Sequence, residues 1–259
     1  MIDIGVNLTN SRFEHDYPEV IARAQLAGLE QLIVTGTNVE ESIAALELCA
    51  LSPKFLSCTA GVHPHDADGV SEDYLFTLAE LAKNESVKAI GECGLDFNRN
   101  FSTPKQQIKV FREQVALAER LNMPLFLHQR DAFEPWQEIL SSVVGKVPAL
   151  ISHCFTGDVK QMHACLEMGM YLGITGWVCD ERRGAELQTA VKELPLERLL
   201  VETDAPYLTP RNIRPKPKSS RNEPSYLPFV VQKIAALKNV SDTVIIEHSR
   251  ENAKKVFSL

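Results

Sequence analysis

Four apolar segments of the sequence each lead into a side chain that can bind a metal ion. These side chains are Glu92, His128, His153 and Asp204. Imidazole nitrogens with carboxylate oxygens form a ligand set that suits Zn²⁺, Mn²⁺ or Fe²⁺, and also Mg²⁺ when water and phosphate oxygens complete the shell. A single histidine after an apolar stretch is usually an ordinary structural residue. Repetition on four segments is hard to attribute to chance, so the pattern predicts a metal site.

Other polar residues follow the same kind of segment. His63 lies close to the end of its apolar segment and is predicted to contact phosphate or substrate. His65 is a second candidate substrate contact, with a plain polar loop residue as the alternative, and Asp96 could support the site. Glu202 and Asp204 are two residues apart, so in a strand they point to the same side. Asp204 is the preferred ligand because it lies nearer the carboxyl end.

A basic, proline-rich segment spans residues 210–224. Its basic residues are Arg211, Arg214, Lys216, Lys218 and Arg221, and its one acidic residue is Glu223. The prolines oppose a helix and keep the segment extended. A run of basic residues is often only a solvated face. Because this run follows the last predicted strand, we expect Arg211, Arg214 and Arg221 to bind substrate phosphates.

Short apolar segments alternate with amphipathic ones along the whole chain. Strands are predicted at 2–6, 32–34, 55–62, 87–92, 124–128, 149–152, 170–175 and 198–201. Helices are predicted at 16–28, 39–51, 71–84, 104–121, 131–144, 159–168 and 186–194, with two more at 227–237 and 241–257. The helix at 104–121 has the clearest apolar stripe, with a three- and four-residue spacing.

The candidate metal ligands require elements that bring distant strand ends together. The predicted strand ends recur about every 28 residues, which fits one strand, one helix and two loops. Eight such units predict a single (β/α)8 TIM-type barrel domain over residues 1–259, with extra helices at the C-terminus. An open doubly wound sheet is the alternative, but no G-x-G-x-x-G motif follows the first strand.

Composition limits the class of protein. The chain has 259 residues, 44% of them hydrophobic, and a formal net charge of −7. This charge gives no general attraction for nucleic acid, so a local basic patch or a metal ion would have to hold phosphate. The six cysteines form no C-x-x-C pair, and no signal peptide or membrane-spanning run is evident. We therefore expect a cytoplasmic protein, and we expect a monomer because no heptad pattern is present.

Six short motifs resemble those of the TatD family of metal-dependent nucleases, within the amidohydrolase-like barrels. They are GVHPH at 61–65, GECGLD at 91–96, FLHQRD at 126–131, ISHCFTG at 151–157, ETDAPYL at 202–208 and RNEP at 221–224. The resemblance implies a 3′-5′ exonuclease on DNA, with single strands preferred and RNA possible, that serves DNA repair or degradation. It also implies Mg²⁺, with Mn²⁺ or Zn²⁺ as alternatives.

The same resemblance implies roles for single residues. Glu92, His128, His153 and Asp204 would bind metal, His63 would lie near the scissile phosphate, and Glu92, His63 and Asp204 would be catalytic. One departure concerns the first strand, where the family's D-x-H-x-H motif is replaced by DIGVN at 3–7. Asn7 offers only a neutral oxygen for a weak second ion or a phosphate. We therefore expect one firmly held metal ion.

The hypothesis from the sequence is metal-assisted hydrolysis of a phosphodiester at a strand end. A divalent ion would polarise the phosphate and activate water, Asp204 would accept a proton, and His63 would help to stabilise the developing charge. One alternative is a barrel hydrolase acting on an amide or ester, although such enzymes usually need the missing H-x-H pair. Another is a non-catalytic nucleic-acid-binding relative.

Overall fold

The computed structural model describes residues 1–259, and it contains one eight-stranded sheet. The strands are β1 (Ile2–Val6), β2 (Gln31–Val34), β3 (Leu56–Ala60), β4 (Val87–Asp96), β5 (Leu125–Arg130), β6 (Leu150–Ser152), β7 (Tyr171–Ile174) and β8 (Leu199–Val201). They follow one another in the order β1 to β8 and pair in parallel. This is the order of a (β/α)8 TIM-type fold, so the predicted fold class is confirmed.

Nine α-helices connect and follow the strands. They are α1 (Tyr17–Leu26), α2 (Val39–Leu51), α3 (Tyr74–Leu81), α4 (Pro104–Leu121), α5 (Phe133–Ser141), α6 (Val159–Glu167), α7 (Ala185–Glu193), α8 (Leu227–Lys238) and α9 (Asp242–Phe257). The bounds of α2 and α4 are those predicted, and the other helices differ from their predicted bounds by at most three residues at either end. The hydrophobic period therefore identified every helix.

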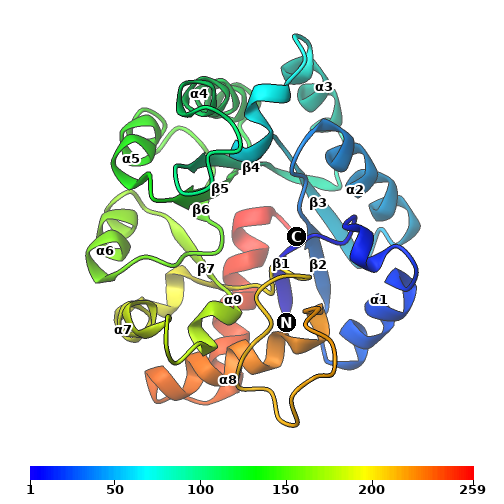
Figure 1. The fold of residues 1–259 in the computed structure, drawn as a ribbon, viewed down its shortest axis with the longest axis vertical. Coiled ribbons are helices and arrows are strands. Elements are labelled where there is room, and N and C mark those ends of the chain that lie inside the picture. Colours follow the sequence, from blue (N-terminus) through cyan, green and yellow to red (C-terminus); the bar gives the residue numbers. More distant parts are fainter. The chain divides into compact units, whose positions relative to one another are not determined.

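The chain forms two compact units. Unit 1 comprises residues 1–34, 154–167 and 171–259, and unit 2 comprises residues 35–153 and 168–170. Unit 1 thus contains β1, β2, β7 and β8, whereas unit 2 contains β3 to β6 with helices α2 to α5 (Figure 1). That residues 1–259 make one domain stays a prediction.

In unit 1 the first and last strands of the sheet lie side by side. The Asn7 N–H donates to the Ala205 carbonyl at 2.8 Å, and the Asp204 N–H donates to the Gly5 carbonyl at 2.9 Å. Helix α9 packs against both β1 and β8. Its Asn252 amide donates to the carbonyls of Leu196 and Leu199, at 2.7 and 2.8 Å. The Asn252 bonds fix the start of β8, and the two backbone bonds to β1 fix the segment after β8, where Asp204 lies.

In unit 2 the fourth strand is longer than predicted. We expected it to end at residue 92, but β4 continues to Asp96. Residues 93–96 pair with residues 127–130 of β5, and helix α4 packs along β4 (Figure 1). The extension carries the GECGLD motif through the strand instead of into a loop. Glu92 and Asp96 are therefore held by a ladder of backbone hydrogen bonds.

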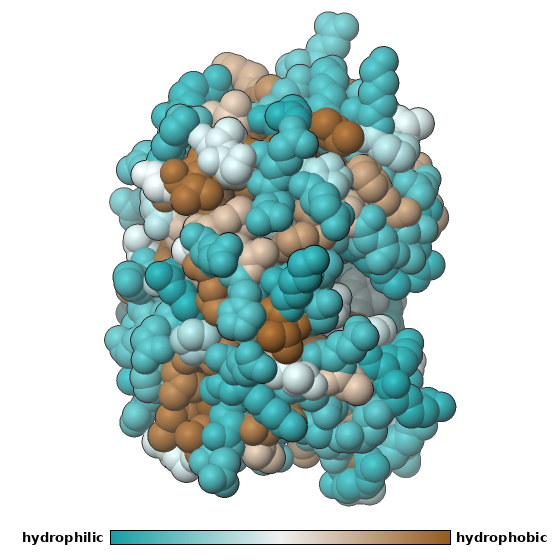
Figure 2. Space-filling model, turned by 90° about the vertical axis from the view of Figure 1, so that its left-hand side faces the viewer, coloured by the Kyte–Doolittle hydropathy of each residue, from teal (hydrophilic) through white to brown (hydrophobic).

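The surface drawn in Figure 2 is mostly hydrophilic, and its hydrophobic side chains form small separate groups. No α-helix combines the length and the apolar character that crossing a membrane requires.

Candidate metal centre

Glycines 91 and 94 explain how β4 and β5 come close enough to share a site. A Cβ at Gly94 would overlap the carbonyl oxygen of His128, and one at Gly91 would overlap the carbonyl oxygen of Phe126. Both glycines also have φ values that L side chains rarely adopt, +145° and +151°. The two glycines of the motif therefore have a packing role, which places Glu92 against the His128 segment.

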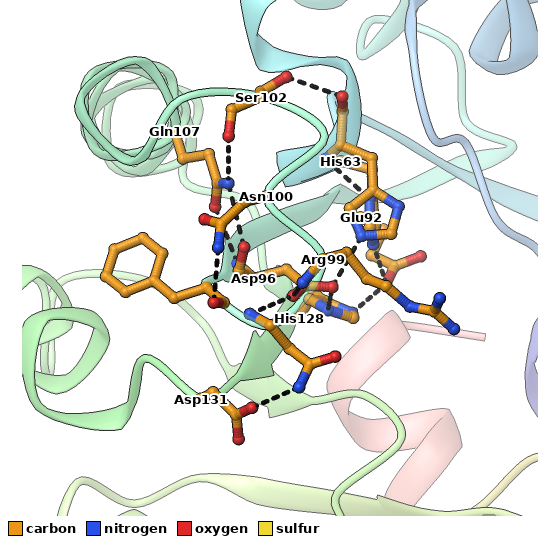
Figure 3. A network of polar contacts seen from close by, with 12 residues as sticks. His63, Glu92, Asp96, Arg99, Asn100, Ser102, Gln107, His128 and Asp131 are labelled. Atoms are coloured by element: carbon orange, nitrogen blue, oxygen red, sulfur yellow. Dashed lines mark hydrogen bonds and ion pairs between the residues drawn. The ribbon is translucent and has the colours of Figure 1, made fainter.

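Three imidazoles surround one carboxylate oxygen in unit 2. Glu92 Oε1 lies 2.9 Å from His128 Nδ1, 3.4 Å from His63 Nε2 and 3.7 Å from His153 Nε2. Glu92, His63 and His153 are buried, and His128 is half-buried. Of the four predicted metal ligands, the structure thus brings Glu92, His128 and His153 together within this unit. Figure 3 shows Glu92 with His63 and His128.

A second pair of groups adjoins this cluster. His65 Nε2 lies 2.7 Å from Asp96 Oδ2, and His128 Nε2 lies 3.7 Å from the same oxygen. The rings of His63 and His65 meet edge to face, with their centroids 4.2 Å apart. Asp96 therefore lies between His65 and His128, and its role in supporting the site stays a prediction.

The pKa values in the cluster follow from burial and from the neighbouring charges. Burial lowers the pKa of His63 to about 3, so its imidazole is neutral at pH 7. Burial raises the pKa of the Glu92 carboxyl, but His153, His63 and His128 outweigh burial and hold this pKa well below its usual range. Burial also opposes protonation of His128, yet Asp96 and Glu92 raise the pKa of His128 above its ordinary value. The result is an ionised carboxylate beside a neutral imidazole.

This donor set fits a divalent metal ion. Ligand atoms of His63, Glu92 and His128 all lie within 4.8 Å of one another. His128 Nε2 is buried and makes no hydrogen bond, since the Asp96 carboxylate oxygen that it faces is 3.7 Å away. A buried polar nitrogen without a partner costs free energy, and metal coordination is one way to compensate for it. We expected His63 to contact phosphate, whereas the structure places it among the candidate ligands. Both roles stay predictions.

Two buried glutamines of α4 hold the backbone after β3 and at the end of β4, a role that was not predicted from the sequence. Gln114 accepts from the Val62 N–H at 2.7 Å and donates to the Val62 carbonyl at 2.9 Å. Gln107 does the same for Asp96, at 2.9 and 3.0 Å. The two glutamines are seven residues apart, on the buried face of the helix. Polar residues at this spacing within an apolar stripe were the signal that could have identified them.

Asp204 lies in unit 1 and is hydrogen-bonded there. Its Oδ1 accepts from Asn7 Nδ2 at 3.0 Å, so Asn7 acts there as a hydrogen-bond donor. Glu202 is fully buried and accepts from the Cys154 N–H. A Cβ at Gly173 would collide with that carboxylate. Glu202 therefore makes a buried hydrogen bond to the backbone of Cys154, whereas the metal or base role of Asp204 and the ion-binding role of Asn7 stay predictions.

The predicted phosphate-binding arginines of unit 1 have partners within the protein. Arg221 binds Asp16 and Glu223, each at 2.7 Å. Arg211 lies 3.0 Å from Asp180, and Arg214 donates to two backbone carbonyls at 2.8 Å each. Arg221 is the least exposed of them, since 20% of its side chain is accessible. These contacts hold the 210–224 segment in place, and phosphate binding by these arginines stays a prediction.

Comparison with known proteins gives one consistent family. The chain matches the sequence profile described as TatD related DNase over residues 2–258. It is 50% identical over 259 residues, all of both chains, to a protein from Pectobacterium parmentieri named 3′-5′ ssDNA/RNA exonuclease TatD.

Two solved structures are similar over nearly their whole length. One is a hydrolase TatD family protein from Entamoeba histolytica, with 27% identity, a TM-score of 0.90 and coverage of 99% of this chain and 97% of that one. The other is a TatD homologue from Escherichia coli K12, with 25% identity, a TM-score of 0.90 and coverage of 100% and 98%. The chain therefore belongs to the TatD-related DNase family.

Proposed function

We propose that the protein is a metal-dependent exonuclease that removes nucleotides from the 3′ end of single-stranded DNA or RNA. Membership of the TatD-related DNase family supports this activity, and so does the name of the relative that is 50% identical. The observation that carries the proposal is the convergence of three imidazoles on Glu92 Oε1. A charged group buried in this way, among metal-binding side chains, is typical of a catalytic centre.

In this proposal Glu92, His128, His153 and Asp204 bind a divalent ion, with Mg²⁺ as the physiological choice. Such an ion supplies a Lewis acid that stabilises negative charge on a phosphate. Asp204 accepts the proton of the attacking water, and the side-chain amide of Asn7 orients its carboxylate. His63, neutral at pH 7 because of burial, serves as a further ligand or as a phosphate contact.

We propose that the substrate contacts come from His65, Arg211 and Arg214. His65 is held by Asp96. Arg211 remains about half-exposed although it is paired with Asp180, so one edge of its guanidinium stays accessible to phosphate. We assign Arg221 to the support of this segment, because its guanidinium is already shared by Asp16 and Glu223.

The test is nucleotide release from end-labelled single strands, with Mg²⁺ and with a chelator. We expect products to shorten from the 3′ end, and we expect the chelator to abolish release. The double variant Glu92→Ala, His128→Ala should lose more than about a thousandfold in kcat/KM, because it removes the charge and the nitrogen at the centre of the cluster. Full activity of this variant would contradict the proposal.

The matched control is His163→Ala. His163 is an exposed histidine on α6 that pairs with Glu193 at 3.3 Å. Its replacement also removes an imidazole near a carboxylate, but on the surface, so activity should be unchanged. A panel of amide and ester substrates tests the alternative. Faster hydrolysis of these substrates than of nucleic acids would favour the barrel hydrolase acting on an amide or ester.

A further inference from the structure

An exposed aromatic ring lies beside the histidine cluster of unit 2. Phe101 is 67% exposed, and its ring meets the His65 ring edge to face with the centroids 4.8 Å apart. Exposing a large apolar ring to water costs free energy unless a ligand covers it. His65 is itself bound to Asp96, which adjoins the candidate metal centre. Phe101 is therefore an exposed ring that can stack on a ligand, and it is separated from Asp96 and the candidate metal centre by His65.

The loop that carries Phe101 is held firmly by hydrogen bonds. Asp96 Oδ1 accepts from the N–H groups of Asn98 and Arg99, at 2.9 and 2.8 Å. At the other end of the loop, Ser102 Oγ donates to the His65 carbonyl at 2.7 Å, and Gln107 donates to the Ser102 carbonyl at 2.9 Å. Asp96 thus contacts both His65 and the backbone of the loop, and Figure 3 shows Asp96 with Arg99 and His128. The exposure of Phe101 is not a consequence of a loose loop.

A cleft of about 320 Å³ opens next to this ring. Its lining includes Phe101, His65 and Val62, together with residues of the 38–40 and 66–71 segments. Its charged lining is acidic and comes from Glu40, Asp66 and Asp68. Such a lining repels a phosphate but accepts a neutral group with hydrogen-bond donors, such as a nucleobase. The cleft therefore favours the base of a nucleotide over its phosphate.

Arg99, in the same loop, has the charge that a phosphate needs. It is exposed, and its guanidinium makes no ion pair, unlike those of Arg211 and Arg221. In Figure 3 its side chain extends to the side of the loop on which His63 and Glu92 lie. A free guanidinium at this place can bind a phosphate oxygen without first breaking a protein contact.

We propose that the 97–103 loop forms a nucleotide subsite, in which Phe101 stacks on a base near the 3′ end and Arg99 binds an adjoining phosphate. This inference rests on the proposed exonuclease function and names the contacts that position its substrate. Stacking is tolerant of sequence because every base has a π-face. The subsite therefore predicts a preference for unpaired strands, whose bases are free to stack, without a marked preference among bases.

The test compares Phe101→Ala with Phe76→Ala on two substrates. Phe76 is a matched control, since it is 68% exposed and lies on α3. The substrates are a normal single strand and the same strand with abasic sites at its last two positions. For Phe101→Ala we expect KM on the normal strand to rise about 5- to 150-fold, the factor that corresponds to about 1–3 kcal/mol per stacked base.

Three results would support the subsite. Phe101→Ala should leave KM on the abasic strand nearly unchanged, kcat should change little, and Phe101→Trp should restore the low KM. Equal effects on the two strands, or an effect no greater than that of Phe76→Ala, would overturn the inference. If the wild-type protein released no nucleotide from either strand, the proposed function itself would fail, and that outcome is distinct from these.

Arg99 gives an independent test through ionic strength. Arg99→Gln should reduce the slope of log KM against log salt by about 0.7, the contribution of one phosphate contact on a single strand. Arg112→Gln is the control, since Arg112 is an exposed arginine on α4 whose side chain is 54% accessible. An unchanged slope for Arg99→Gln would remove Arg99 from the subsite.

Discussion

Two buried carboxylates, one in each unit, have opposite electrostatic surroundings. Glu92 on β4 faces three imidazoles, which hold its pKa below the usual range in spite of burial. Asp3 on β1 is also fully buried, but its partners are the Thr203 hydroxyl and N–H and the Gly5 N–H. Burial raises the pKa of Asp3 to about 7, and the nearby Glu202 adds to the rise.

The comparison shows that burial alone does not identify a functional carboxylate. Glu92 stays ionised because the surrounding imidazoles attract its charge and His128 hydrogen-bonds to it, and the same imidazoles are side chains that can bind a metal ion. Asp3 can be protonated near neutral pH, and its oxygens accept hydrogen bonds that join β1 to the segment after β8. The site is therefore identified by the partners of a buried charge, and Asp3 has a structural role.

The largest effect on stability is expected from a substitution that forces β4 away from β5. Gly94→Ala would force a Cβ onto the His128 carbonyl at a φ of +151°. We expect a loss of more than about 3 kcal/mol of unfolding free energy, because both overlap and backbone strain oppose the native state. Urea unfolding measures it. Gly69→Ala is the control, since no atom lies within 4 Å of its Cβ. Equal stability of the two variants would contradict the packing role of Gly94.

An effect of intermediate size is expected on the stability of the protein as a function of pH, and it arises from the ionisation of Asp3. Its folded pKa, about 7, lies above the ordinary value of 3.8, so the native state binds more protons than the unfolded state between these pH values. The stability from protonated Asp3 is fully present below about pH 4 and is lost as pH rises through 7. Asp3→Asn should thus be more stable than wild type at pH 8, by on the order of 1–4 kcal/mol, with little difference near pH 4.

Thermal unfolding from pH 4 to pH 8 measures this difference. Asp73→Asn is the control, because Asp73 is exposed and lies at the start of α3. A constant gap between Asp3→Asn and wild type across this range would show that Asp3 is ionised throughout, and the contrast with Glu92 would then disappear.

The smallest expected effect concerns Asn7, which donates to Asp204. Asn7→Ala removes a donor that orients a proposed base, so kcat should fall about tenfold, or about 1.4 kcal/mol, with stability little changed. Asn7→His keeps an N–H donor and should retain more activity than Asn7→Ala. Steady-state kinetics at saturating Mg²⁺ measure kcat for both variants and for the wild type. Equal kcat for Asn7→Ala and wild type would show that Asp204 needs no such donor.

The strands, the helices and three of the cluster residues could be predicted from the sequence. The spacing of hydrophobic residues along the chain identified the helices and strands. Glu92, His128 and His153 were selected because the carboxyl ends of the parallel strands of a barrel lie on one side. The extension of β4 was missed because the glycines of GECGLD suggested a loop. Only the close approach of β5, a long-range feature, shows that these glycines continue the strand.

The partners of charged residues were beyond a reading of the chain alone. Arg221 was predicted to bind phosphate, which stays a prediction, and its ion pair with Asp16, 205 positions earlier, was not predicted. Phe101 and Arg99 were not singled out because no local pattern marks a loop side chain as exposed and unpaired. Exposure and pairing depend on which loops the fold brings together, and only the tertiary structure supplies that information.

The most direct test of the central claim is an anomalous difference map from crystals soaked in Mn²⁺. We expect a peak within about 2.0–2.4 Å of a Glu92 carboxylate oxygen and of nitrogens of His128 and of His153 or His63. The peak should vanish in Glu92→Ala, His128→Ala crystals. A map with no peak beside Glu92, or with the ion held only by other residues, would contradict the assignment of this cluster as the metal centre.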